Sequence, residues 1–170
     1  MRAEFGVTIK RPIAAVFAML ARVDAWPAWA ASAPEVRQTS SGPLGVGATF
    51  AQTFTVDGRS VMLTEEMIAY EPPHTLAYRS IDGPLPLTCA YTLEAMAEGT
   101  RLALEITEMG NGVPADAVII DAIVSAAGRD LDALAALLEG RTPTEVTLSG
   151  RDGKMMGRIR RTGAERWRPT

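Results

Sequence analysis

The sequence contains one cysteine, Cys89, and one histidine, His74, in 170 residues. A single cysteine excludes an internal disulfide framework and a zinc site built on paired cysteines. The H-x-x-x-H spacing and the Asp-rich loops of common metal sites are also missing, so we expect no metal and no bound cofactor. Because the cysteine and the histidine occupy different structural settings, nucleophilic catalysis by a Cys–His pair is not expected either.

Long apolar runs are equally scarce. No run reaches the roughly 20 residues that span a bilayer, and no basic and apolar signal opens the chain. We therefore expect a cytoplasmic protein without a transmembrane segment. A glycine-rich loop over residues 40–47 precedes a strand pattern and not a helix, which excludes the phosphate-binding motifs that such loops otherwise indicate. The length, with 47% hydrophobic and 22% charged residues, is typical of one globular domain.

Charge is divided unevenly along the chain. Residues 1–140 carry 9 basic and 17 acidic side chains, whereas residues 141–170 carry 8 basic and 3 acidic ones. We therefore divide the chain into a domain over 1–140 and a basic C-terminal extension over 141–170, in which Asp152-Gly153 marks a candidate β-hairpin. Clustered arginine is a non-specific signal, so we expect the extension to fold onto the acidic body and predict no specific nucleic-acid binding. Docking to a partner, a membrane surface or a second subunit of a homodimer is the alternative.

The stretch from Gly47 to Met109 carries most of the information about the fold. Asp57-Gly58, Asp82-Gly83 and Glu98-Gly99 separate runs of alternating apolar and polar residues. Such pairs mark hairpins because tight primed turns need positive φ angles. One face of each run is apolar, which is typical of an antiparallel sheet buried on one side. The predicted strands are Ala48–Val56, Ser60–Glu71, Thr75–Ile81, Pro86–Ala95 and Thr100–Met109.

Helical patterns flank this meander. A strand over Ala3–Lys10 leads into a helix from Pro12 and a second short helix, in which Trp26 and Trp29 are expected to plug one end of the core. A short strand from Glu35 to Thr39 follows. The longest helix is predicted over Pro114–Glu139, after a Gly110–Gly112 loop expected to act as a gate. This order predicts an α+β helix-grip fold: a curved antiparallel sheet of about seven strands, with two short helices after strand 1, wrapped around a long C-terminal helix.

Three motifs resemble a known family. They are Val46-Gly-Ala-Thr-Phe, the run Tyr70-Glu-Pro-Pro-His-Thr-Leu-Ala-Tyr-Arg-Ser, and Gly99-Thr-Arg-Leu. Over about residues 3–139 the chain resembles the polyketide cyclase/dehydrase branch of the START-like (helix-grip, SRPBCC) superfamily. The resemblance implies a deep, mostly apolar cavity between the sheet and the long helix that binds lipids, polyketides, sterols or similar molecules. Some members of the family close rings or remove water in that cavity.

The inward faces of the predicted elements supply candidate ligand contacts. Periodicity alone does not separate a cavity wall from a dry core, but the resemblance favours a cavity. The predicted apolar lining is Phe50, Phe54, Leu63, Met67, Leu87, Cys89, Tyr91, Leu104, Ile119 and Ile123. Gln52 lies in phase with the apolar residues of its strand. Tyr78 and Tyr91 could donate a hydrogen bond to a ligand carbonyl; alternatively, they pack with their hydroxyls at the rim.

Glu65 is the one candidate catalytic residue. It lies in phase with Leu63 and Met67, and a buried carboxylate must be paired, protonated or at a wet site. A raised pKa would suit a general acid or base; alternatively, a bulge at Glu65-Glu66 would turn both side chains to solvent. We therefore predict binding of a hydrophobic small molecule. The alternatives are a cofactor-independent cyclase or dehydratase using Glu65, and an interaction module acting through the basic extension.

Overall fold

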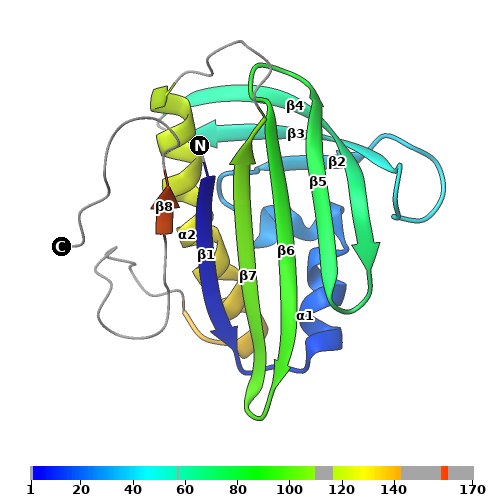
Figure 1. Ribbon diagram of the computed structural model, residues 1–170, viewed down its shortest axis with the longest axis vertical. Coiled ribbons are helices and arrows are strands. Elements are labelled where there is room, and N and C mark those ends of the chain that lie inside the picture. Colours follow the sequence, from blue (N-terminus) through cyan, green and yellow to red (C-terminus); the bar gives the residue numbers. More distant parts are fainter. Residues whose placement is uncertain (1, 57, 110–116, 143–157, 161–170) are drawn as a thin grey trace.

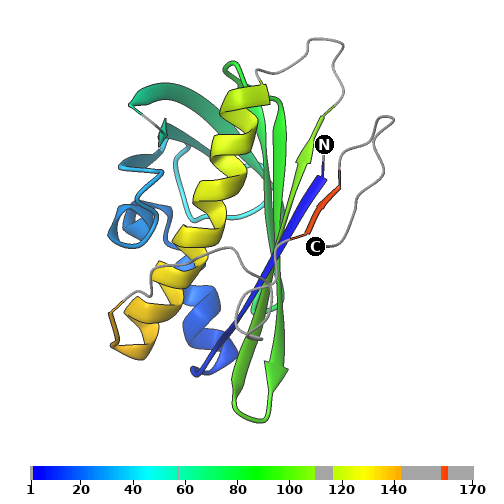
Figure 2. The same ribbon diagram turned by 90° about the vertical axis from the view of Figure 1, so that its left-hand side faces the viewer.

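One antiparallel sheet curves around a long helix in the computed structural model of the chain (Figures 1 and 2). The structure describes residues 2–56, 58–109, 117–142 and 158–160; of residues 56, 117–121 and 158–160 it describes the backbone only. The strands are β1 (Arg2–Ile9), β2 (Glu35–Gln38), β3 (Thr49–Val56), β4 (Arg59–Glu71), β5 (Thr75–Asp82), β6 (Leu87–Met96), β7 (Gly99–Glu108) and β8 (Arg158–Arg160). The helices are α1 (Ile13–Leu20), the 3-10 helix η1 (Val23–Ala28) and α2 (Ala117–Glu139).

The strand order is β2-β3-β4-β5-β6-β7-β1-β8, with every neighbouring pair antiparallel. Strands β3 to β7 form the predicted meander, and β1 returns beside β7. Helix α2 lies across the concave face of the sheet, and α1 and η1 close one end (Figure 2). The predicted α+β helix-grip fold is confirmed, because the seven strands β1 to β7, two short helices and the long helix occur in the expected order.

The turns contain the backbone conformations that the sequence predicts. Gly58, Gly83 and Gly99 have φ angles of 75°, 116° and 140°, in the region that residues with a side chain rarely adopt. Space also requires glycine at two of these positions. A Cβ at Gly83 would lie 2.7 Å from the carbonyl oxygen of Met62, and one at Gly99 would collide with the carbonyl oxygen of Ile9.

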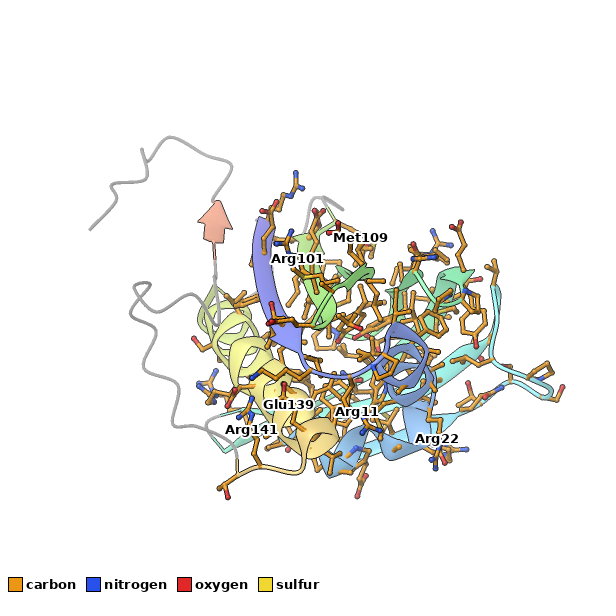
Figure 3. All side chains as sticks on the ribbon, turned by 90° about the horizontal axis from the view of Figure 1, so that it is seen from below. Arg11, Arg22, Arg101, Met109, Glu139 and Arg141 are labelled. Carbon is orange, nitrogen blue, oxygen red and sulfur yellow. The ribbon has the colours of Figure 1, made fainter. Side chains whose placement is uncertain are left out.

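The far end of α2 is attached to β1 by a carboxylate. Oε1 of Glu139 accepts a hydrogen bond from the backbone N–H of Lys10 (2.8 Å), and Oε2 accepts one from Nε of Arg141 (2.6 Å). Partial burial raises the pKa of Glu139, but these two hydrogen bonds and the positive charges of Arg141 and Lys10 together outweigh it, and the net pKa is lowered. Figure 3 shows Glu139 and Arg141 side by side at the end of α2. This attachment fixes the helix over the sheet.

Two predictions fall partly outside the described residues. The predicted helix start at Pro114 and the gate at Gly110–Gly112 lie there, and α2 is described from Ala117. The candidate hairpin of the C-terminal extension also lies there, except for β8, which pairs with residues 2–4 of β1 at the edge of the sheet. Among the helices of the described part, none has the length and apolar character needed to cross a bilayer.

Candidate functional site

A cavity lies between the concave face of the sheet and α2. The space in which the centre of a water molecule fits measures about 60 Å³. One bound water needs about 10–15 Å³ when the space is measured in this way. The cavity is therefore large enough for a small organic molecule and too small for a whole lipid unless it widens. Its walls are formed by Trp26, Trp29, Ala30, Ser32, Ala33, Gln52, Phe54, Leu63, Glu65, Tyr78, Leu87, Cys89, Tyr91, Leu104, Ile106, Ile123, Ala127, Asp130 and Leu131.

The alternation of the strands explains why these side chains meet. Successive residues of a strand point to opposite faces, so the inward set of β3 to β7 recurs at every second position. The register places Gln52 of β3 opposite Leu63 of β4, and Tyr78 of β5 opposite Cys89 of β6. The sheet thus contributes one continuous wall, and α2 and the segment following η1 contribute the other.

Most of the predicted site residues meet at this cavity. Those that line it are Gln52, Phe54, Leu63, Glu65, Tyr78, Leu87, Cys89, Tyr91, Leu104 and Ile123. Phe50 and Met67, which were also predicted as lining residues, are fully buried in the core and do not border this cavity. Phe50 is covered by Trp26 and Tyr78, whose ring centroids lie 5.4 and 5.3 Å from its own. The side chain of Ile119 lies outside the described residues.

Glu65 points into the cavity. Its side chain is 3% exposed, and its Oε2 atom has no hydrogen-bond partner. Burial raises the pKa of Glu65 to about 8, because an ionised carboxylate is poorly solvated there. The pairing of β4 with β5 is irregular between Thr64 and Glu65, but the irregularity does not turn both glutamates outward. Glu66 alone faces the outer side, where Oε2 lies 2.9 Å from Nη2 of Arg79.

Other buried polar atoms without a partner accompany Glu65. Oε1 of Gln52 and Nε1 of Trp29 also border the cavity, on side chains that are 6% and 5% exposed. Oγ of Ser80 is a further one, and Ser80 is the cross-strand neighbour of Glu65. Buried polar groups are nearly always hydrogen-bonded in folded proteins. The described lining thus leaves the hydrogen-bonding capacity of three of these atoms unused at one cavity.

Tyr78, Tyr91 and Cys89 form the wall next to Glu65. Burial raises the pKa of both tyrosines, and it raises the pKa of the Cys89 thiol to about 12, with a further contribution from the Glu65 charge. These groups are consequently neutral at pH 7. Trp26 lies against Tyr78, with 5.3 Å between ring centroids, and Tyr78 lies 6.3 Å from Tyr91. The cavity thus has an aromatic wall that holds no charge.

Asp130 is a site residue that the sequence analysis missed. It is 8% exposed, and its Oδ2 atom accepts a hydrogen bond from the Ser32 hydroxyl. Burial raises the pKa of Asp130, while hydrogen bonds from Ser32 and from the Ala31 backbone oppose that rise. A signal was present, since Asp130 lies seven residues after the predicted contact Ile123 and so on the same helix face. The tryptophans expected as an end plug, Trp26 and Trp29, are buried and also border the cavity.

The distribution of charge around the cavity is one-sided. Every lysine and arginine whose side chain the structure describes is exposed, and none borders the cavity. Within the described ranges, no group of three or more histidine, cysteine or acidic side chains is arranged to hold a metal ion. Glu65 and Asp130 are therefore the only lining residues whose side chains ionise readily, and both are acids.

The sequence model of a family described as polyketide cyclase / dehydrase and lipid transport matches residues 2–139 of the chain. No match was found among curated protein sequences. Solved structures give several similarities to the fold. The Zhui aromatase/cyclase from Streptomyces sp. R1128 matches with a TM-score of 0.68 at 18% identity, over 82% of this chain and 93% of that one.

Two further structures give the same result. The protein Ara h 8.0201 matches with a TM-score of 0.66 at 15% identity, over 83% of this chain and 99% of its own. A protein from Rhodobacter sphaeroides matches with a TM-score of 0.61 at 25% identity, over 82% of this chain and 93% of its own. All three similarities cover nearly the whole of the compared structure, so the sheet and its helices constitute a complete unit of this fold.

Proposed function

Because the chain belongs to the polyketide cyclase/dehydrase and lipid transport family, we propose that it binds a small, mostly apolar molecule in the cavity between its sheet and α2. The observation that supports this most directly is the set of unpartnered polar atoms on Trp29, Gln52 and Glu65 in a mostly apolar lining. Ligand sites typically combine apolar walls with a few placed polar groups. The apolar part of the ligand would contact Leu63, Leu104 and Ile123, and its polar part would reach Glu65.

The energetics favour an occupant. Each buried polar group without a partner costs about 1–3 kcal/mol. A ligand that supplies a hydrogen bond to Gln52 or Glu65 removes part of that cost. Apolar contacts add about 25 cal/mol for each Å² of apolar surface removed from water. Both contributions act together only on a molecule that has an apolar body and at least one polar group.

The size of the cavity indicates the probes for a binding experiment. At roughly 10–15 Å³ per water its interior takes about four to six waters, which suits a small bicyclic compound such as 1-naphthalenemethanol. Binding can be followed by the fluorescence of Trp26 and Trp29, since both border the cavity, and by native mass spectrometry. We expect binding in the micromolar to millimolar range and one site per chain.

Filling the cavity should abolish this binding. Ala127 of α2 borders the cavity, so Ala127→Phe would occupy it, and we expect the affinity for 1-naphthalenemethanol to fall at least tenfold. Ala103→Phe is the matched control, because Ala103 is exposed on β7. Equal affinity in the wild type and in Ala127→Phe would exclude the cavity as the binding site.

A cofactor-independent cyclase or dehydratase is the second candidate. It is favoured by the buried position of Glu65, whose pKa of about 8 lets the carboxyl donate or accept a proton near neutral pH. The ionised carboxylate would remove a proton from the carbon next to a ketone. The test is hydrogen–deuterium exchange at that carbon of 1-tetralone, with wild type and Glu65→Gln compared by NMR. A rate that does not differ between them would remove Glu65 from any such reaction.

A further inference from the structure

We propose that the ligand of this cavity carries a protonated amine, which the carboxylate of Glu65 binds as an ammonium ion beside an aromatic wall. This inference rests on the proposed function and names the chemical class of the molecule. It follows from three features of the cavity: the sign of its ionisable groups, the absence of an internal partner for Glu65, and the aromatic rings around it. Each of these is independent of the family to which the chain belongs.

The ionisable lining favours a cation. Glu65 and Asp130 are acids, and no lysine, arginine or histidine of the described part of the chain borders the cavity. All described lysine and arginine side chains are exposed; Arg22, for example, lies at the outer surface in Figure 3. A fatty acid or other carboxylate would bring a negative charge into a cavity whose described lining holds no cation to offset it. The lining therefore favours a cation over an anion.

Among the residues that the structure describes, Oε2 of Glu65 has no hydrogen-bond partner. The ionisable groups that interact with it or share its cavity are Tyr78 of β5, Cys89 and Tyr91 of β6, and Asp130 of α2. The tyrosines and the thiol are neutral at pH 7, and Asp130 is already hydrogen-bonded to Ser32. A buried carboxylate that lacks a cation is costly. An ammonium ion from outside is the group that would offset this cost.

The hydrogen-bonding atoms match an ammonium group in part. An alkylammonium ion has three N–H donors and no acceptor, and Oε2 of Glu65 and Oε1 of Gln52 are acceptors without a donor. Both side chains point inward from neighbouring strands, Gln52 from β3 and Glu65 from β4. Nε1 of Trp29 is a donor, so it is not met by the ammonium. A hydroxyl or carbonyl oxygen elsewhere on the ligand would accept from it.

The aromatic wall adds a second attraction for a cation. Trp26, Trp29, Tyr78 and Tyr91 all border the cavity, and the centroid distances of 5.3 to 6.3 Å show that they form one cluster. The face of an aromatic ring attracts a cation within about 6 Å of its centroid, and it does so most strongly at a desolvated site. Raised pKa values keep both phenols neutral, so no phenolate competes with Glu65 for the ammonium ion.

The charge balance of binding can be written out. In the free protein near pH 7 most Glu65 side chains hold a proton, since the pKa is about 8. The amine arrives already protonated. Glu65 releases its proton to solvent, and the carboxylate and the ammonium ion remain as a pair. Binding should release up to about 0.9 proton at pH 7, the limit reached when Glu65 is fully ionised in the complex, and fewer as pH rises towards 8, because the population of Glu65 that still holds a proton falls.

Three ligands with the same ring system test the inference. 1-Naphthalenemethylamine is a cation at pH 7, 1-naphthalenemethanol is neutral, and 1-naphthoic acid is an anion. We expect the amine to bind at least tenfold more tightly than the alcohol, and the acid to bind most weakly. Titration calorimetry of the full chain, repeated in buffers with different ionisation enthalpies, measures both the affinity and the number of protons released.

Substitution of two neighbouring glutamates tests whether Glu65 causes the preference for the amine and the release of a proton. Glu65→Gln should reduce the affinity for the amine to that for the alcohol and abolish proton release. Glu66→Gln is the matched control, because Glu66 faces the outer side with Arg79, and it should change neither quantity. If the alcohol binds as tightly as the amine, or if amine binding releases no proton, the ammonium inference is wrong while the binding function stands. If none of the three compounds binds, the proposed function fails and the inference fails with it.

Discussion

Glu65 and Glu66 are consecutive residues of β4 that lie in opposite environments. Glu65 is 3% exposed, faces the cavity and has no partner for Oε2, whereas Glu66 forms an ion pair with Arg79 on the outer face, 2.9 Å between Oε2 and Nη2. The alternation of a strand separates them. One carboxyl is therefore available to the cavity and the other contributes only a surface ion pair, which is worth about 1 kcal/mol or less.

Glu65 should make stability depend on pH. Its carboxyl has an ordinary pKa of 4.5 and a folded-state pKa of about 8. Between these values the folded state holds a proton that the unfolded state has lost, so the free energy of unfolding falls as pH rises. The favourable contribution is complete below pH 4.5 and is lost as pH rises to 8. The slope from this one group is about 1.4 kcal/mol per pH unit.

Comparison with Glu65→Gln isolates that slope. We expect the variant to become more stable relative to the wild type from pH 5 to pH 8, and the difference to level off above pH 8. Urea unfolding at each pH measures it. Glu66→Gln should give a nearly constant difference over the same range. A constant difference for Glu65→Gln as well would mean that its carboxyl titrates normally and is not buried as described.

The hydrogen bond between Ser32 and Asp130 should stabilise the wall of the cavity. It joins the segment after η1 to α2, and both residues are buried. Ser32→Ala removes the donor from a buried acceptor, so we expect a loss of about 1–3 kcal/mol in the free energy of unfolding.

Ser60→Ala is the control for that change. The Ser60 hydroxyl is hydrogen-bonded to Thr55 Oγ1 (2.9 Å) at an exposed position, where substitutions are usually within about 0.5 kcal/mol of neutral. Chemical unfolding of both variants at pH 7 gives the comparison. Equal small effects would show that the Ser32–Asp130 contact adds nothing to stability.

The turn between β6 and β7 should tolerate no side chain. Gly99 has a φ of 140°, and a Cβ there would collide with the carbonyl oxygen of Ile9. We expect Gly99→Ala to destabilise the protein by at least about 2 kcal/mol, because it combines a strained backbone with a backbone clash. Gly45→Ala is the control, since a Cβ at Gly45 meets no atom within 4 Å. Thermal unfolding should separate the two variants, and a Gly99→Ala protein as stable as the wild type would contradict the described turn.

The fold could be predicted from local chemistry. The glycines at residues 58, 83 and 99 marked the hairpins, because only a few residue types adopt the φ that such turns require. Alternation then assigned the inward face of each strand, including Gln52 and Glu65. These signals are short-range, and the antiparallel meander brings sequence neighbours together. Tertiary information was not needed to obtain the order of the elements.

The site could be predicted only in part, because a side chain on the buried face can border a cavity or lie behind it. Phe50 and Met67 share their faces with Gln52 and Glu65, yet packing against Trp26 and Tyr78 places Phe50 in the core. Asp130 was missed for a related reason. Its spacing from Ile123 placed it on the inner face of α2, but its partner Ser32 lies 98 residues away, and no pattern in the sequence indicates that contact. The absence of a partner for Glu65 likewise depends on every element around it.

The central claim is that Glu65 is an unpaired buried carboxyl that faces the ligand cavity. A ¹³C NMR titration of its side-chain carboxyl carbon, assigned by comparison with Glu65→Gln, measures this directly with and without 1-naphthalenemethylamine. We expect a midpoint near pH 8 in the free protein and a decrease of about one unit or more on binding, each unit corresponding to about 1.4 kcal/mol of interaction with the ionised form. A midpoint near 4.5 in the free protein, or one that the amine does not move, would contradict the claim.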